Sequence, residues 1–150
     1  GENKAPSMEK GRGKTLPEAV KKSLDALGAK SEPFFLMVEG AQIDNGGHSN
    51  STSDIIQEML DFDQAIAEAI RFADAHKNTL VVITADHETS GFGIVGGSLQ
   101  DGTVHGDFLT IDHTGIMVPL FAYGPHAEDF NGVYENTEVF QKILLALESK

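Results

Sequence analysis

Three short apolar runs limit what this chain can fold into. They are residues 34–38 (FFLMV), 80–84 (LVVIT) and 118–123 (VPLFAY). Each has the length of a strand, and continuous runs of this kind are typical of strands buried on both faces of a sheet. None approaches the roughly 18 apolar residues of a membrane-spanning helix. The runs therefore predict a buried sheet and no membrane span.

Amphipathic helices are expected around these runs. A capping-box pattern at residues 15–18 (TLPE) begins the first helix, and Gly28 ends it. A long helix begins near Asp54, with Ser53 and Asp54 as candidate caps. A last helix begins at residues 136–138 (NTE). The predicted apolar faces are Leu16, Val20, Leu24 and Leu27; Ile55, Ile56, Met59, Leu60, Ile66, Ile70 and Phe72; and Val139, Phe140, Ile143, Leu144 and Leu147.

The order of these elements predicts the fold class. The long helix connects the run at 34–38 to the run at 80–84, which is a βαβ unit, so these two strands should be parallel. Residues 90–106 contain six glycines and are expected to form an excursion with a short hairpin. We therefore expect an α/β fold over residues 15–150, with a largely parallel sheet covered by helices, after a flexible lead-in at residues 1–14.

Composition excludes several classes of function. The net charge of −12 argues against nucleic acid or an anionic membrane as a partner and suits a protein that gathers cations. With no cysteine, the chain has no disulfide framework, no thiolate zinc site and no cysteine nucleophile. The first 14 residues lack the hydrophobic core of a signal peptide, so we expect no export signal in this sequence.

Carboxylates and imidazoles accompany all three apolar runs. In open α/β sheets, ligands bind beyond the carboxyl ends of the strands. Oxygen and nitrogen ligands without sulfur suit catalytic Zn²⁺, and a purely carboxylate group suits Mg²⁺. Each of these residues, taken alone, could be a helix cap or a solvated loop residue. Only their occurrence together indicates a metal site. The residues are Glu39, Asp44 and His48; Asp86, His87 and Glu88; and Asp112 and His113.

Other polar residues are expected to be structural or solvent-exposed. Asp61 and Asp63 are predicted on the exposed side of the long helix, and residues 45–47 (NGG) are predicted to form a loop. The serines near the candidate site lie in no nucleophile-elbow pattern, so helix capping is their expected role. The remaining histidines, His76, His105 and His126, are expected to lie outside any site.

Four segments together resemble the bacterial alkaline phosphatases: residues 35–44 with His48, 84–89, 113–115 and 118–125. The likeness covers about residues 15–147. It implies two Zn²⁺ ions and one Mg²⁺ ion above the edge of a mixed sheet, and hydrolysis of phosphomonoesters through a phosphoserine intermediate. By this resemblance, the magnesium carboxylate is Glu39, the first zinc ligands are Asp44, His48 and His113, and the second zinc ligands are Asp86 and His87. If Asp86 and His87 bind one ion, the chain must leave extended geometry at Ala85 or Asp86.

The resemblance also implies what this sequence lacks. The family's serine nucleophile, phosphate-clamping arginine, bridging aspartate and magnesium threonine belong to its N-terminal half and have no counterpart here. Asn45 stands where some members contact phosphate, which leaves substrate contact open. The chain therefore resembles a C-terminal portion in which at most the first zinc site is complete, and which is inactive alone. The resemblance implies a periplasmic or secreted parent, with the N-terminal half as a partner. Uncovered sheet edges lead us to expect a homo-oligomer.

Two alternatives remain at this point. One is a fragment of a relative with the same metal core, such as a phosphodiesterase, a phosphonate hydrolase or a cofactor-independent phosphoglycerate mutase. The segment 39–44 (EGAQID) favours the phosphatase over these relatives. The other alternative is a non-catalytic zinc-binding domain, which the missing nucleophile supports.

Overall fold

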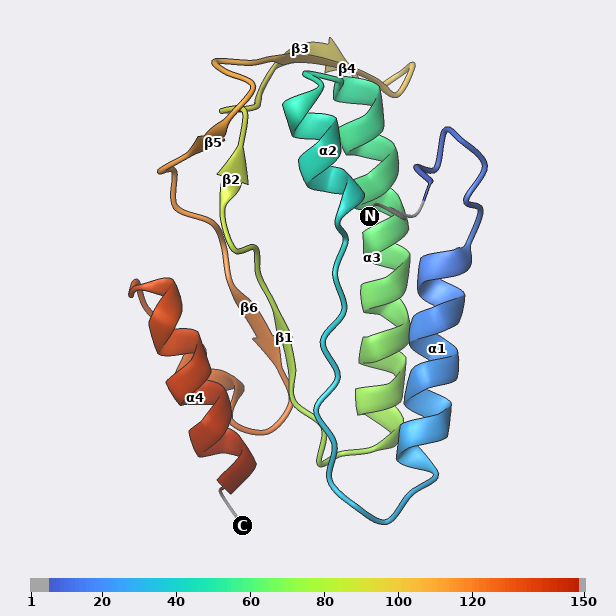
Figure 1. Cartoon of the computed structure of the whole chain (residues 1–150), viewed down its shortest axis with the longest axis vertical. Helices are drawn as coiled ribbons and strands as arrows, with labels where there is room; N and C mark the ends of the chain where they lie inside the picture. The colour runs from blue at the N-terminus through green and yellow to red at the C-terminus, as the bar shows by residue number, and fades with distance from the viewer. Residues whose placement is uncertain (1–5, 149–150) are drawn as a thin grey trace, which may run out of the picture.

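The computed structural model describes residues 6–148, and its framework is a pair of packed helices, α1 (Thr15–Gly28) and α3 (Thr52–Ala75) (Figure 1). The core lies between them, where Val20 and Leu24 of α1 meet Ala65 of α3. The two helices therefore bury one another's apolar stripes, as the helical periodicity predicted. Partly buried side chains around this core are Leu16, Phe34, Leu36, Val38, Ala69 and Phe72.

The first apolar run is extended but is not part of a β-ladder. Residues 33–40 run in the same direction as β1 (Val81–Ile83) in Figure 1, without a strand assignment of their own. Phe34, Leu36 and Val38 pack on the helical core, whereas Phe35 and Met37 are 63% and 70% exposed. The prediction of burial on both faces is therefore wrong for this run, because helices cover only one of its faces.

The prediction of a largely parallel sheet is also wrong. β1 pairs with β6 (Phe121–Tyr123) in an antiparallel ladder, with Val82 opposite Ala122. Parallel neighbours need a crossover connection, usually a helix, and residues 84–120 contain none. The α/β class is confirmed, but each ladder among residues 6–148 is antiparallel and two-stranded.

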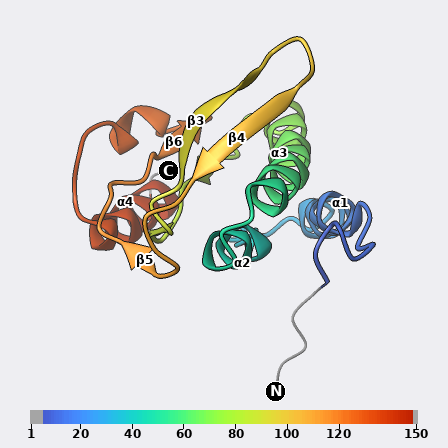
Figure 2. The same ribbon diagram turned by 90° about the horizontal axis from the view of Figure 1, so that it is seen from above.

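The glycine-rich excursion forms the expected hairpin. β3 (Gly93–Ser98) pairs with β4 (Thr103–Asp107), and the register shifts between Ile94 and Gly96. The hairpin reaches across the N-terminal end of α3 when the molecule is seen from above (Figure 2). At its base, β2 (Glu88–Thr89) pairs with β5 (His113–Thr114). The excursion thus brings residues 88–89 beside 113–114.

Helix starts differ from the sequence prediction. Ser51, not Ser53 or Asp54, caps α3, since its side chain accepts a hydrogen bond from the Asp54 N–H. The capping box at the start of α1 is absent: the Thr15 hydroxyl donates to the Arg12 carbonyl instead of accepting from the helix. Cap choice depends on where the preceding chain arrives, which the local sequence does not specify.

The C-terminal segment is thinly packed. It comprises a 3₁₀ turn, η1 (Ala127–Phe130), and α4 (Asn136–Glu148). No residue of α4 is buried, so its predicted apolar face is largely uncovered. Lys142 connects α4 to the segment before it. Its ammonium donates a hydrogen bond to the Asp129 carbonyl at 2.6 Å and lies 4.5 Å from the centre of the Tyr134 ring.

Residues 6–14 contact α3 through a cluster of charges. The Arg12 guanidinium donates to Asp61 at 2.7 Å and to the Glu58 carboxylate, which also accepts from the Met8 N–H. Asp61 is only 1% exposed, so its predicted exposure is wrong, while Asp63 is exposed as expected. The buried carboxylate is tolerated because a guanidinium neutralises it. The flexibility expected of residues 1–14 stays a prediction, and residues 1–5 lie outside the described part of the chain.

Candidate metal centre

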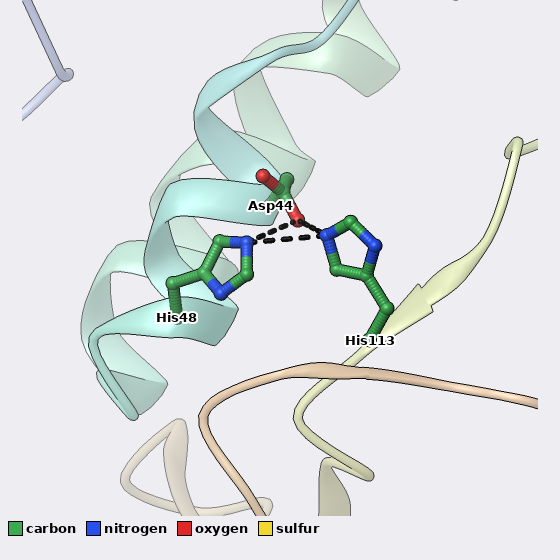
Figure 3. A group of neighbouring side chains, drawn as sticks. All are labelled: Asp44, His48 and His113. Carbon is green, nitrogen blue, oxygen red and sulfur yellow. Dashed lines mark hydrogen bonds and ion pairs between the residues drawn. The ribbon is translucent and has the colours of Figure 1, made fainter.

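Three side chains predicted as metal ligands converge above α2 (Gln42–His48). Asp44 and His48 lie one turn apart on α2, and His113 enters from β5 (Figure 3). One ligand atom from each lies within 4.8 Å of the others. Asp44 Oδ1 is 3.3 Å from His48 Nε2 and 3.5 Å from His113 Nε2, and the two Nε2 atoms are 3.2 Å apart. Three ligand atoms therefore point at a common centre.

Two glycines allow α2 to occupy this position. The segment at 45–47 was predicted to be a loop, but it lies inside α2, which corrects that prediction. Gly46 and Gly47 are buried against α3 and β2. A Cβ on Gly46 would lie 3.0 Å from the Ile55 nitrogen, and one on Gly47 would lie 2.8 Å from Thr89 Cγ2. The glycines serve close packing of a helix here, not turn geometry.

A hydrogen bond orients the His48 ring. Its Nδ1 lies 2.5 Å from the Ile111 carbonyl oxygen. A carbonyl can only accept, so Nδ1 carries the proton and Nε2 keeps a free lone pair directed at Asp44 and His113. This arrangement, with one ring nitrogen held by a backbone carbonyl, is typical of metal-binding histidines.

Thr89, which was not predicted as a site residue, links two of the candidate ligands. Its hydroxyl donates to Asp44 Oδ1 at 2.6 Å and lies 3.2 Å from His87 Nδ1. Because the single hydroxyl proton goes to the carboxylate, the hydroxyl oxygen accepts from Nδ1–H of His87. The Nε2 lone pair of His87 is therefore also free. A threonine two residues after a candidate ligand gives no sequence signal of this role.

The second predicted pair lies beside the first group. The chain bends at Asp86, as two neighbouring ligands require, and Asp86 Oδ2 is 3.4 Å from His87 Nε2. The His87 ring stacks on the His113 ring, with centroids 3.6 Å apart. Asp86 and His87 thus lie next to the three-residue group without joining it.

Glu88, which directly follows His87, joins β2 to β5, the strand that carries His113. Its carboxylate accepts from the N–H groups of Gly91 and Phe92, at 3.0 Å and 3.2 Å, and from the Thr114 hydroxyl. Burial alone would raise the pKa of Glu88. The three hydrogen bonds outweigh it and hold the pKa below its ordinary value. Glu88 therefore occupies this position as a carboxylate.

Glu39 lies apart from these residues. It lines a groove of about 330 Å³ together with Arg12, Asp44, Asn45 and Glu58. The Asn45 amide donates to the Gln42 side chain and the Ala41 carbonyl, within α2 and its cap. The groove brings Glu39 and Asp44 to one surface, but Glu39 is outside the three-residue ligand group. His76, His105 and His126 also lie outside that group, as expected.

Within residues 6–148, no helix is long and apolar enough to cross a membrane. The oxygen and nitrogen donors of Asp44, His48 and His113, with the His48 imidazole oriented by the Ile111 carbonyl, fit a zinc-type ligand set. The ligand set alone does not identify the family of the chain.

Comparisons with known proteins identify it. The sequence profile of alkaline phosphatase matches residues 4–106 and 102–149. The chain is 33% identical to the Escherichia coli K12 alkaline phosphatase, over 89% of this chain and 32% of that protein. It is 36% identical to the streptomycin-6-phosphate phosphatase of Streptomyces griseus, over 88% of this chain and 35% of that protein. It therefore spans about a third of the length of these curated relatives.

Solved structures agree with this result. The alkaline phosphatase from the Antarctic bacterium TAB5 superposes with a TM-score of 0.89 at 43% identity, over 97% of this chain and 44% of that one. A variant of that enzyme with Mg bound in its M3 site gives 0.88 at 42% identity, with the same coverage. These matches favour the phosphatase over the related hydrolases and the mutase. The chain belongs to the alkaline phosphatase family and corresponds to a C-terminal portion of it.

Proposed function

We propose that this chain supplies the metal-ligand portion of an alkaline phosphatase, which hydrolyses phosphomonoesters through a phosphoserine intermediate. The observation that carries the proposal is the convergence of Asp44, His48 and His113 within 4.8 Å in a chain of this family. The curated relatives named above are phosphatases by name. Because the chain spans about a third of their length, the activity is proposed for the complete protein.

We propose three metal positions, which the family resemblance implies and the ligand types suit. We assign the first Zn²⁺ to Asp44, His48 and His113, and a second to Asp86 and His87, which lack a third ligand in the described chain. Glu39 is assigned to Mg²⁺, a preference of carboxylate oxygen. A variant of the similar TAB5 enzyme, in which a histidine is replaced by glutamate, has Mg bound in its M3 site, which supports the proposal of a magnesium position in this chain. Bound ions would supply Lewis-acid activation of the attacking and leaving oxygens.

The chain's own residues prepare these positions. The Ile111 carbonyl keeps the proton of His48 on Nδ1, and Thr89 does the same for His87 while holding Asp44. Each contact fixes which ring nitrogen is free. In the proposed centre, Ile111 and Thr89 orient the ligands. Residues that hydrogen-bond to the ligands usually have this role in metal sites.

We also propose that the chain alone is inactive. Neither arginine is free to clamp a phosphate group: Arg12 is paired with Glu58 and Asp61, and Arg71 is paired with Glu68 at the exposed surface. Ser51 caps α3, and Ser90 is fully buried. The nucleophile and the phosphate clamp are therefore assigned to the remainder of the parent protein.

Metal content and activity test this proposal together. We expect the purified chain to retain zinc after dialysis. His113→Ala should lose it, because only two of the three proposed ligands of the first site remain. His105→Ala, which alters an exposed histidine of the hairpin, is the matched control and should retain zinc. Affinity should fall as the pH is lowered, since imidazole must be neutral to coordinate.

An aryl phosphate assay completes the test. No turnover above a metal-free control is expected. Equal zinc content in His113→Ala would refute the first site. Zinc-dependent turnover abolished by Asp44→Ala and Asp86→Ala would refute the inactivity of the chain. The chain could also bind zinc and yet show no activity when the N-terminal part of a family member is added. That result would favour a non-catalytic zinc-binding domain.

Association and location complete the proposal. We expect the isolated chain to form a homo-oligomer through its uncovered apolar surfaces. The proposed partners of the parent are phosphomonoester substrates and the N-terminal half of the enzyme, with no nucleic acid. A periplasmic or secreted parent is proposed from the family resemblance.

A further inference from the structure

The Glu88 side chain ties the turn after β2 to β5. Its Oε2 accepts from Gly91 N–H at 3.0 Å and from the Thr114 hydroxyl, and its Oε1 accepts from Phe92 N–H at 3.2 Å. Gly91 and Phe92 lie in the turn that follows β2. Thr114 lies in β5, directly after His113. One carboxylate, next to His87 in the sequence, therefore fastens the turn after β2 to the strand that carries His113.

The backbone ladder between these segments is very short. Glu88 is opposite Thr114, and Thr89 is opposite His113, with two residues on each strand. Isolated two-stranded ladders are at best marginally stable in water. Ser90 adds three backbone bonds beyond one end of this ladder: its N–H donates to the Asp112 carbonyl at 2.9 Å, and its carbonyl accepts from the N–H groups of Leu109 and Thr110 at 2.9 Å and 3.2 Å. The side-chain bond from Thr114 to Glu88 fastens the opposite end, at the last residue pair of the ladder.

The register determines how the two candidate metal positions face one another. His87 precedes Glu88, and His113 precedes Thr114, so a shift of one strand displaces one imidazole against the other. The rings are stacked at 3.6 Å, with 20° between their planes. His113 in turn belongs to the three-residue ligand group with Asp44 and His48.

We propose that Glu88 is a positioning residue of the metal centre, which holds His87 and His113 in register by clamping Thr114 and the turn at 91–92. The inference rests on the proposed function for the nature of the site. The chemistry of the contact favours glutamate in particular, because three donors converge and a carboxylate offers only acceptors. A glutamine amide would place its own N–H groups against a backbone N–H in either orientation.

The experiment uses four variants of the chain. Glu88→Gln removes the all-acceptor carboxylate with little change in size. Thr114→Val removes only the hydroxyl, and Thr114→Ser restores it. Glu32→Gln, at an exposed position in the loop after α1, is the matched control for loss of a carboxylate. Circular dichroism of each variant reports whether the helices are retained.

Three readouts separate positioning from stability. The first is the NMR ring-current shift of the His87 and His113 ring protons in the metal-free chain. The second is Zn²⁺ affinity by competition with a chromophoric chelator. The third is the visible spectrum of the chain saturated with Co²⁺, which reports ligand geometry and does not change with stability alone.

We expect Glu88→Gln to lose the stacking shift, to bind Zn²⁺ about tenfold more weakly and to alter the Co²⁺ spectrum. Thr114→Val should change all three readouts in the same direction, and Thr114→Ser should restore them. Unchanged shifts, affinity and spectrum in a folded Glu88→Gln would overturn the proposal. If that variant does not fold, unchanged readouts in Thr114→Val overturn it instead. If the unmodified chain binds no metal, the proposed function fails, and the metal-free NMR shifts still decide whether Glu88 positions the histidines.

Discussion

Arg12 shows how a single charged side chain can attach a segment to the body of this molecule. Its guanidinium is only 8% exposed and lies between the carboxylates of Glu58 and Asp61, which α3 presents one turn apart. Removing three charges from water is costly, and their mutual attraction offsets that cost only while all three are present. The contact is therefore much more sensitive to loss of one partner than a surface ion pair.

We predict that Arg12→Met lowers the free energy of unfolding by about 3 kcal/mol or more, because two buried carboxylates lose their countercharge. Arg71→Met is the matched control: Arg71 is 67% exposed and pairs with Glu68, so its loss should cost less than about 1 kcal/mol. Urea denaturation of both variants measures the difference. Equal midpoints would show that the Arg12 cluster adds no more than a surface pair.

Residues differ in how well sequence alone could identify them. The convergence of the candidate ligands Asp44, His48 and His113 was accessible from sequence, because carboxylate and imidazole follow or precede apolar runs in a recognisable family pattern. Arg12 and Thr89 were not, because their partners lie 49 and 45 residues away and nothing local marks them. Asp61 was misplaced for the same reason, since its burial depends on Arg12.

At the scale of elements, helical periodicity predicted α1, α3 and α4 to within a few residues but missed α2, and strand pairing was less predictable. The run at 34–38 is uniformly apolar, so the sequence does not reveal that only alternate residues meet the core. β6 is antiparallel to β1 because the connection between them, residues 84–120, contains no crossover helix. The composition of that connection does not reveal the direction of β6. Cap positions failed because Ser51, Ser53 and Asp54 are all suitable caps, and the arriving backbone selects among them.

The cap on α3 gives a test at this scale. We predict that Ser51→Ala lowers the free energy of unfolding by about 1 kcal/mol, because the Asp54 N–H loses its acceptor at the start of the helix. Ser53→Ala, which removes one of the two candidate caps predicted from sequence, should change the free energy of unfolding by only a few tenths of a kcal/mol. Thermal or urea unfolding of the two variants measures the ranking. The reverse order would place the cap at Ser53.

The whole molecule exposes more surface than its mass requires. Its accessible area is 10,370 Å². A compact monomer of 16.1 kDa would expose about 7,400 Å². Part of the excess is apolar, and large exposed apolar patches mark interaction sites or aggregation-prone surfaces. Exposed apolar side chains on the extended segment, β6 and the C-terminal region include Phe35, Met37, Met117, Phe121, Val133, Phe140 and Leu145.

We predict that the isolated chain associates at tens of micromolar, with a mass by light scattering well above 16.1 kDa. The double variant Phe35→Ser and Met37→Ser should reduce this association while retaining the helical circular dichroism signal, because both side chains point away from the core. A monomeric unmodified chain at this concentration would contradict the expectation.

The ligand group also joins distant parts of the chain. His48 and His113 are 65 residues apart in sequence, yet their Nε2 atoms lie 3.2 Å from each other. An ion held by both would act as a crosslink that closes this long loop, and such clips restrict the unfolded chain more as the loop lengthens. The enclosed segment contains all of α3, β1 and the β3–β4 hairpin. Zinc in this position would therefore protect most of the molecule against unfolding, including residues that never contact the ion.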